Sequence, residues 1–436
     1  MLAGRRTDRH EPERVTVRSV RGNAFLMLVG TVTFAAAQWL AIVVIARVGS
    51  PKLVGQYALG LAIAGPVVLL ASLNLRAALT TDALEKYPVG LYVRVRLIGI
   101  VISFITIVLI SFGLAFPIPV RTVIVMVGAL KSVEAYSDII YGAAQRIERH
   151  DLVARSLVAR GLLGVAALTV GMIVSGGSLA AGLSFTLAVW MLVVFLNDIP
   201  SAVRLGVSRH ELVGVARAGR LGGTLRLARE AAPLGLVMLL GSLAANAPRY
   251  VVELFLGTEA LGYFAAVASL LLIGSTIMNA VGQAASPRLA LLAARNRTLE
   301  LQRLVVRLLG IAVLVGFLFL ILLSAFGSPI LERLFTTAYG RYADVATVLM
   351  LAGVAMLASS VFGYSITALR AFRVQVPIEA AKLSVAVVAL LVLVPRWGLI
   401  GAAWALVFVS VVDLLVKGVV FSRLASRLPA GTSVRS

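Results

Sequence analysis

The chain has 436 residues, of which 60% are hydrophobic and only 14% are charged, and its mean hydropathy is +1.00. A soluble protein of this length has roughly 25% charged and 45–50% apolar residues, so such an excess does not fit inside one core. The composition excludes a soluble enzyme, a secreted module and a disordered chain, and it indicates a multi-pass membrane protein. The absence of cysteine also excludes disulfides and thiolate metal sites.

Twelve apolar segments are each long enough to cross the hydrocarbon core as a helix, which takes about 20 residues. None has the period-two alternation of a membrane barrel strand. The first is too long for a cleaved signal peptide and is interpreted as an uncleaved anchor. In chain order the segments cover residues 23–46, 53–75, 97–116, 120–143, 153–174, 178–198, 231–256, 260–285, 305–326, 343–366, 376–395 and 398–420.

The positive charges predict the orientation of these spans. If the N-terminus is cytoplasmic, 31 of the 40 lysines and arginines lie on the cytoplasmic side, six lie on the other side and three lie inside spans. This distribution is a strong positive-inside signal for twelve helices with both ends in the cytoplasm. The net charge of +21 is therefore explained by topology and by attraction to anionic lipids, not by nucleic acid.

The predicted fold is an all-α polytopic membrane protein with about twelve transmembrane helices. We expect a cytoplasmic tail at residues 1–22, a six-helix bundle at 23–198, a basic amphipathic cytoplasmic linker at 199–230, a second six-helix bundle at 231–420 and a tail at 421–436. The segment after the first span, 49–58, weakly resembles the segment after the seventh, 257–265. Two halves of equal topology predict a pseudo-twofold axis along the membrane normal and a cavity between the bundles.

Charged residues in the fourth predicted span form one stripe. Lys131, Glu134 and Asp138 are spaced i, i+3 and i+7, so they lie within about 60° of one another on a helix. Each would cost about 2.5–3.5 kcal/mol at the membrane centre, so the stripe must face the bundle interior or water. Two interpretations remain open for it: a polar wall of the cavity, or a closed ionic cluster that holds helices together.

Five further polar residues are candidates for the same cavity or for its ends. Arg160 in the fifth span lies at a depth that permits a pair with Asp138, and Asn246 and Arg249 lie in the seventh span beside Pro248. Arg249 and Glu253 are i, i+4 neighbours that could neutralise each other. Arg76 and Arg47 end the second and first spans; arginine suits phosphate because its planar fork donates two parallel hydrogen bonds, but residues at span ends also serve as membrane anchors.

No reaction centre is evident in the sequence. There is no complete G-x-x-x-x-G-K-[ST] motif, no HExxH and no cluster of metal ligands, and the three histidines lie in charged loops. We therefore predict no catalytic residues, no metal, no cofactor and no enzymatic activity. The sequence instead predicts a protein whose helices enclose a path across the membrane.

Several short motifs stand in parts of the chain that are far apart in sequence, among them Ala46-Arg47-Val-Gly49, Gly55-Gln-Tyr57 and Leu261-Gly262-Tyr263-Phe264. They are similar to the A-R-x-x-G and G-x-Y of the first hairpin and to the L-G-Y-Y of bacterial polysaccharide flippases of the multidrug/oligosaccharidyl-lipid/polysaccharide exporter superfamily, and the resemblance covers most of the chain. Pro395-Arg-Trp-Gly398-Leu-Ile-Gly401-Ala-Ala is similar to the P-x-Y-G-I-x-G-A-A that opens the last span. One departure is Pro248, which replaces the acidic residue before the seventh-span arginine.

The resemblance implies a flippase that moves undecaprenyl-diphosphate-linked oligosaccharide from the cytoplasmic to the periplasmic leaflet of the inner membrane by alternating access. It implies polysaccharide polymerase and glycosyltransferases as partners. Under this hypothesis the substrate is bound by Arg249, Lys131, Arg76 and Arg47, and the cavity or ion-coupling residues are Glu134, Asp138, Arg160 and Asn246. The alternatives are a cation-coupled multidrug exporter of the same superfamily and a non-transporting subunit of a polysaccharide assembly complex.

Overall fold

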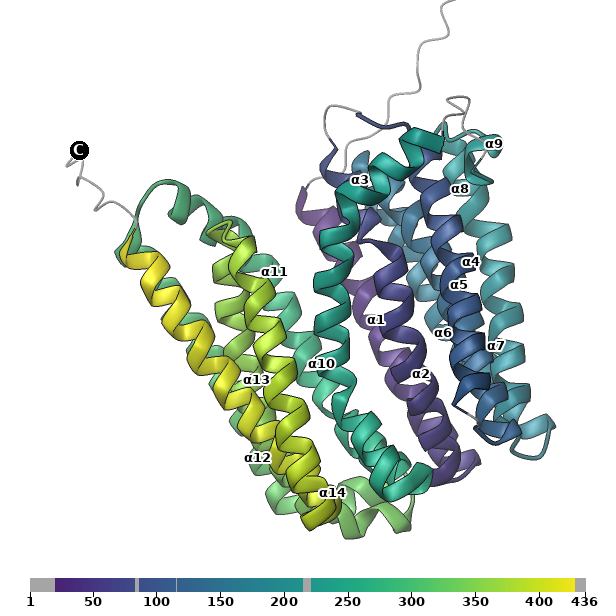
Figure 1. Cartoon of the computed structure of the whole chain (residues 1–436), viewed down its shortest axis with the longest axis vertical. Helices are drawn as coiled ribbons and strands as arrows, with labels where there is room; N and C mark the ends of the chain where they lie inside the picture. Colours follow the sequence, from purple (N-terminus) through teal and green to yellow (C-terminus); the bar gives the residue numbers. More distant parts are fainter. Residues whose placement is uncertain (1–19, 83–85, 115, 215–220, 428–436) are drawn as a thin grey trace, which may run out of the picture.

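A computed structural model describes residues 20–82, 86–114, 116–214 and 221–427. The outer parts of both predicted tails and residues 215–220 of the predicted linker lie outside these ranges. The described chain forms two lobes of helices and contains no strand, so the predicted all-α class is confirmed (Figure 1).

The N-terminal lobe comprises helices α1 to α9. They are α1 Val20–Val48, α2 Pro51–Ser72, α3 Leu75–Thr81, α4 Val89–Gly113, α5 Ile118–Arg146, α6 His150–Val174, α7 Leu179–Val193, a π-helical turn Val194–Asp198, α8 Ile199–Arg204 and α9 Arg209–Leu212. Local sequence explains two of these boundaries. Ser50 caps α2 ahead of Pro51 at the first helical position, and left-handed Leu73 and Asn74 separate α2 from α3.

The C-terminal lobe comprises α10 Leu221–Ala268, α11 Leu271–Ala294, α12 Thr298–Leu334, a 3-10 turn Thr337–Tyr342, α13 Ala343–Ala368 and α14 Phe372–Ser426. Two of its helices change direction at a glycine with positive φ: Gly257 in α10 (φ 82°) and Gly398 in α14 (φ 59°). After Gly398 the chain turns back on itself, because the backbone at Gly401 lies so close to the carbonyl oxygen of Leu393 that an added Cβ would overlap it. Only glycine adopts the positive φ of Gly257 and Gly398 at little cost in free energy.

Nine helices of the described chain are long and apolar enough to cross a membrane. Helix α5, which carries the charged stripe, is not among them. Helix α14 has 55 residues, and a straight helix of that length would span about 80 Å against a hydrocarbon core of about 30 Å. The reversal at Gly398 agrees with the predicted boundary between spans 376–395 and 398–420, while the total of twelve crossings stays a prediction.

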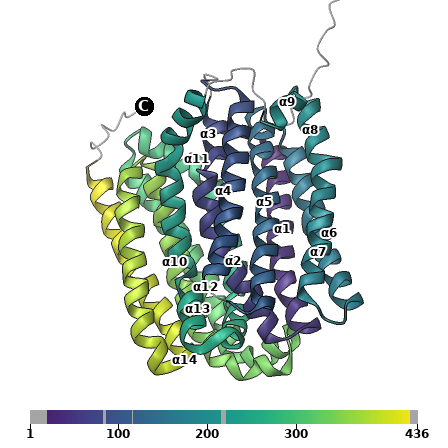
Figure 2. The same ribbon diagram turned by 45° about the vertical axis from the view of Figure 1, so that its right-hand side comes forward.

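Helices α2 and α10 join the two lobes along most of their length. At one end, Gly55 and Gly262 bring the two backbones into direct contact; in the middle, the Tyr250 hydroxyl donates to the Ala62 carbonyl; at the other end, Gly235 lies against Leu70 and Leu73. Small residues permit such close approach between membrane helices. Helices α11 to α14 lean away from α1 to α9 towards the upper end of Figure 1, where α3, α8 and α9 lie in both views (Figure 2).

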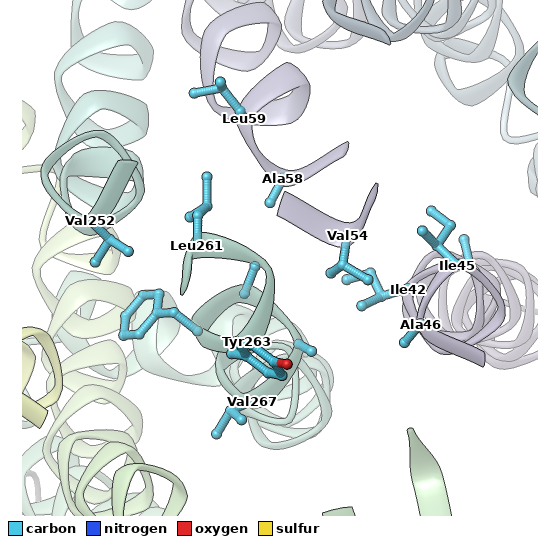
Figure 3. Close-up of a cluster of buried hydrophobic side chains, with 14 of the residues drawn as sticks. Ile42, Ile45, Ala46, Val54, Ala58, Leu59, Val252, Leu261, Tyr263 and Val267 are labelled. Carbon is cyan, nitrogen blue, oxygen red and sulfur yellow. The ribbon is translucent and has the colours of Figure 1, made fainter. Parts of the chain in front are cut away.

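The lobes meet in an apolar seam towards the lower end of Figure 1. Ile42, Ile45 and Ala46 of α1 and Val54, Ala58 and Leu59 of α2 belong to one buried cluster with Val252, Leu261, Tyr263 and Val267 of α10 (Figure 3). The chain thus closes one end of the molecule with a cluster of buried apolar side chains.

Candidate functional site

Two adjoining cavities form the candidate site; the N-terminal lobe supplies most of their walls, and a few residues of α10 and α11 supply the rest. The deeper one, about 260 Å³, is lined by α1, α2, α5, α6, α7, α10 and Leu272 of α11. The outer one, about 500 Å³, lies nearer the upper end and is lined by α1 to α6 and Met238 of α10. They share Phe34, Gly65, Lys131, Glu134 and Arg160, and we call them together the central cavity.

Helix α5 presents its predicted stripe to this cavity. Lys131 and Glu134 line both cavities and form an ion pair of 2.7 Å, while Asp138 lines the outer cavity. The position of the stripe follows from helical periodicity and from the cost of placing charges against lipid. The two interpretations of the stripe are therefore both partly realised, since its residues line the cavity and are also paired.

Asp138 is held by two arginines. Its two carboxylate oxygens accept from Arg76 of α3 at 3.0 Å and from Arg96 of α4 at 2.9 Å. The pair of Asp138 with Arg160 that the sequence permitted is not formed, because both carboxylate oxygens bond to arginines of α3 and α4. Sequence reasoning missed Arg96, which it counted among the loop cations, although α4 begins at Val89 and buries Arg96 to 1% exposure.

Arg160 of α6 lines both cavities with its guanidinium largely unsatisfied. Its Nη1 donates to the Tyr141 hydroxyl at 3.2 Å and its guanidinium carbon lies 4.6 Å from the centre of the Trp190 ring. In the described chain its Nε and Nη2 have no hydrogen-bond partner, and the side chain is 1% exposed. Buried donors without partners are rare, which makes these two N–H groups candidate ligand contacts.

The C-terminal lobe contributes Arg249 and Asn246 of α10 to the deeper cavity. Arg249 Nη1 donates to the Asn246 side-chain oxygen at 2.7 Å, and the Asn246 amide donates to the Ser242 carbonyl. The predicted Arg249–Glu253 pair is not formed, because Glu253 accepts from the Thr258 hydroxyl at 2.6 Å. No carboxylate in the described chain pairs with Arg249.

Arg47 does not line the central cavity. It lies at the end of α1 and donates to the carbonyls of Leu334, at 2.9 Å, and of Arg333, both at the C-terminal end of α12. A cation at a helix C-terminus satisfies free carbonyls and interacts favourably with the helix dipole. Arg47 therefore links the two lobes at the closed end of the molecule.

The charge of the cavity is strongly one-sided. Five cationic side chains (Arg76, Arg96, Lys131, Arg160 and Arg249) face two carboxylates (Glu134 and Asp138), a formal excess of three positive charges. Both carboxylates are already paired with cations. No group of three or more metal-ligating side chains occurs in the residues that the structure describes. The cavity is suited to an anionic ligand.

The fold and cavity define a two-lobed helical membrane protein, and comparison with known proteins specifies the family. The profile of the family described as "Polysaccharide biosynthesis protein" matches residues 19–293, so the chain belongs to this family. The chain is 25% identical over 390 residues to the capsular polysaccharide biosynthesis protein CapF of Staphylococcus aureus, covering 89% of this chain and 96% of CapF.

The fold is shared by several solved structures of transporters and flippases. A multidrug resistance MATE family transporter of the MOP superfamily in its inward-facing conformation superposes with a TM-score of 0.71 at 12% identity, covering 93% of this chain and 99% of that one. The lipid II flippase MurJ in an inward closed conformation gives a TM-score of 0.67 at 10% identity, covering 92% and 90%.

Proposed function

We propose that the protein is a flippase that translocates undecaprenyl-diphosphate-linked oligosaccharide from the cytoplasmic to the periplasmic leaflet by alternating access. The observation that carries this proposal is the central cavity, with three cations in excess of its carboxylates, in a chain of the polysaccharide biosynthesis family. The names of CapF and MurJ support the same substrate class.

The chemistry of the cavity fits the head group of such a lipid. The negative charge of a diphosphate makes its transfer into hydrocarbon costly in free energy. Arginine stabilises this charge by donating two parallel hydrogen bonds to the phosphate oxygens. Arg160 and Arg249 have no carboxylate partner among the described residues, so they are the first candidates to bind the diphosphate. Arg76 is already paired with Asp138, and Lys131 is already paired with Glu134. We assign Glu134 and Asp138 to charge balance rather than ion coupling, because each is already paired.

A multidrug exporter for cations is the second candidate, and the fold alone permits it. Such an exporter would need carboxylates free to meet a cation, whereas both carboxylates of this cavity already have one or two cationic partners. A non-transporting subunit of a polysaccharide assembly complex is the third candidate, and it would not need an unsatisfied arginine facing a cavity.

The orientation and partners belong to the same proposal. The positive-inside rule puts both termini, and the upper end of Figure 1, on the cytoplasmic side of the inner membrane. The cavity would then open towards the leaflet in which the lipid-linked sugar is made. The basic loops of that side would contact anionic lipids, and polymerase and glycosyltransferases would supply or take up the substrate.

The test uses the host strain with the gene deleted. Undecaprenyl-diphosphate-linked oligosaccharide is extracted and its leaflet is measured by periplasmic accessibility. We expect cytoplasmic-side accumulation, relieved by the wild-type chain but not by Arg160→Gln; the control Lys86→Gln removes an exposed cation outside the cavity and should restore export. Unchanged lipid-linked glycan with new sensitivity to cationic dyes would indicate the drug exporter instead.

Equal amounts of each variant in the membrane must be verified by immunoblot. An Arg160→Gln variant that is present at the wild-type level and exports normally would contradict the assignment of Arg160 to the substrate. If variants of Arg160 and Arg249 changed only the amount of protein, the assembly-subunit alternative would be favoured.

A further inference from the structure

Helix α11 carries a stripe of uncharged polar side chains that the proposed function does not use. Thr276, Asn279 and Gln283, which we call the α11 stripe, follow Leu272 by four, seven and eleven residues. At 100° per residue all four lie within about 60° of one another on the helix. Leu272 lines the deeper cavity. The stripe therefore continues the cavity-lining face of α11 towards the upper end of Figure 1.

The opposite face of α11 packs into its own lobe. Gly274, Met278 and Gly282 are buried there, and Gly274 lines an apolar cavity between α11, α12 and α13. Asn279 and Gln283 are exposed instead, and α11 contacts α1 of the N-terminal lobe. The α11 stripe thus faces away from the C-terminal lobe, on the side where α11 approaches the other lobe.

The polar side chains of this face are not suited to lipid. Like α5, α11 is not among the helices of the described chain that are apolar enough to cross a membrane. An amide group exposed to hydrocarbon is costly, because its donors and acceptors find no partner. Polar side chains of membrane helices often bond to a neighbouring helix. The Gln283 side chain makes no such bond to a described residue, so helix association does not account for it.

Helix α13 holds Asn279 in position. The Tyr364 hydroxyl donates to the Asn279 side-chain oxygen at 2.8 Å. The Tyr364 ring lies so close to Gly282 that an added Cβ would overlap it. The Asn279 amide nitrogen remains available as a donor. The Thr276 hydroxyl donates to the Leu272 carbonyl at 2.7 Å and keeps its capacity to accept. The stripe therefore offers donors and acceptors without charge.

We propose that the α11 stripe binds the sugar portion of the substrate, while the cationic wall of the N-terminal lobe binds the diphosphate. This inference rests on the proposed function for the nature of the ligand. Sugar hydroxyl groups both donate and accept, and amide and hydroxyl side chains match them. A carboxylate on this face would repel the diphosphate, and the uncharged stripe does not. The two lobes thus bind two chemically different parts of one head group.

The test compares two probes of equal charge, whose binding to purified full-length protein is measured by calorimetry. One probe is farnesyl-diphosphate-linked N-acetylglucosamine, and in the other a methyl group replaces the sugar. Both phosphates are esterified in each probe, so the two differ only in the sugar. We expect the wild type to bind the sugar probe about tenfold more tightly, which corresponds to one or two hydrogen bonds between neutral groups.

Two variants remove single members of the α11 stripe. Gln283→Leu and Asn279→Leu should each reduce the preference for the sugar probe about threefold or more, and should leave binding of the methyl probe unchanged. Arg160→Gln should weaken binding of both probes. Since Gln283 is exposed and has no partner among the described residues, its replacement leaves no buried group unsatisfied and should not impair folding.

Gln302→Leu is the matched control. Gln302 is an exposed glutamine of α12, a helix that contributes no residue to the central cavity, so this variant should bind both probes as the wild type does. Tyr364→Phe removes only the hydroxyl that orients Asn279. It should lower the preference for the sugar probe less than Asn279→Leu does, without changing binding of the methyl probe.

The outcomes separate the two proposals. Equal affinity of the wild type for the two probes, or a sugar preference retained in both Gln283→Leu and Asn279→Leu, overturns the inference and leaves the flippase intact. Stripe variants that bind both probes more weakly to the same extent would show a structural role and overturn it too. If the wild type binds neither probe, the proposed function is contradicted and the inference falls with it.

Discussion

Both lobes bury ion pairs among their apolar helices, but these pairs face different surroundings. In the N-terminal lobe, Asp138 joins Arg76 and Arg96 at the wall of the central cavity. In the C-terminal lobe, Lys417 lies between Asp413, at 2.9 Å, and Glu379, at 3.4 Å, and neither of these carboxylates lines that cavity. The C-terminal lobe has an apolar cavity of about 30 Å³ between α11, α12 and α13 and an open apolar groove of about 540 Å³ along α14, and no charged residue lines either of them.

The two lobes have similar helical architecture, but their buried charges serve different purposes. The charges of the N-terminal lobe remain available to a ligand, whereas those of the C-terminal lobe neutralise one another inside it. Arg249 is the exception, because it is the one charged residue of the described C-terminal lobe that lines the central cavity. Substitutions in the two lobes should therefore separate transport from stability.

The largest effect is expected for Asp138→Asn. It leaves Arg96, which is almost fully buried, without its carboxylate, and breaking a buried ion pair costs about 3–5 kcal/mol of folding free energy. Thermal unfolding in detergent should show this loss. The matched change Asp413→Asn should cost less, because Lys417 keeps Glu379 as a partner. Equal losses in the two variants would contradict the contrast between the lobes.

The next largest effect is expected on transport for Arg249→Gln. A hydrogen bond from a charged donor contributes about 1.5–3 kcal/mol, so the rate of export should fall about tenfold or more. The control is Lys417→Met, which removes a cation of the same lobe that does not line the cavity; it should lower thermal stability and leave the export rate per folded molecule unchanged. Loss of export in both variants would remove the distinction between ligand and structural charges.

Sequence patterns predicted the helices and part of the site well, for identifiable reasons. Hydropathy located the apolar helices, and the glycines at 257 and 398 stand where the predicted spans divide. Helical periodicity placed Lys131, Glu134 and Asp138 on one face, and the cost of exposing charges to lipid directed that face to the interior.

Contacts between helices could not be predicted in the same way. Periodicity states which residues share a face, but it does not state which neighbouring helix meets that face. The depth of the two residues therefore permitted a pair of Asp138 with Arg160, whereas the structure pairs Asp138 with Arg76 and Arg96.

A moderate effect is expected for Gly262→Ala at the contact between α2 and α10. An added Cβ would overlap the carbonyl oxygen of Pro51, so the closed end could form only if the helices moved apart. The population should shift towards molecules open at this end. Since the chain has no native cysteine, a single cysteine at Ala58 in the seam reports this as faster thiol labelling. Gly310→Ala, which meets nothing within 4 Å, is the control and should label at the wild-type rate.

The smallest effect is expected for Arg47→Ala, and it decides between two roles for this residue. Removing its hydrogen bonds to the end of α12 should cost about 0.5–1.5 kcal/mol each, which raises labelling at the closed end a few-fold and changes export little. Arg121→Ala, which removes an arginine bonded only within the N-terminal lobe, should not raise labelling. If export fell as far as in Arg160→Gln while labelling stayed constant, Arg47 would bind substrate, as its sequence motif suggested. Labelling that rises while export persists identifies Arg47 as a link that holds the two lobes together at one end.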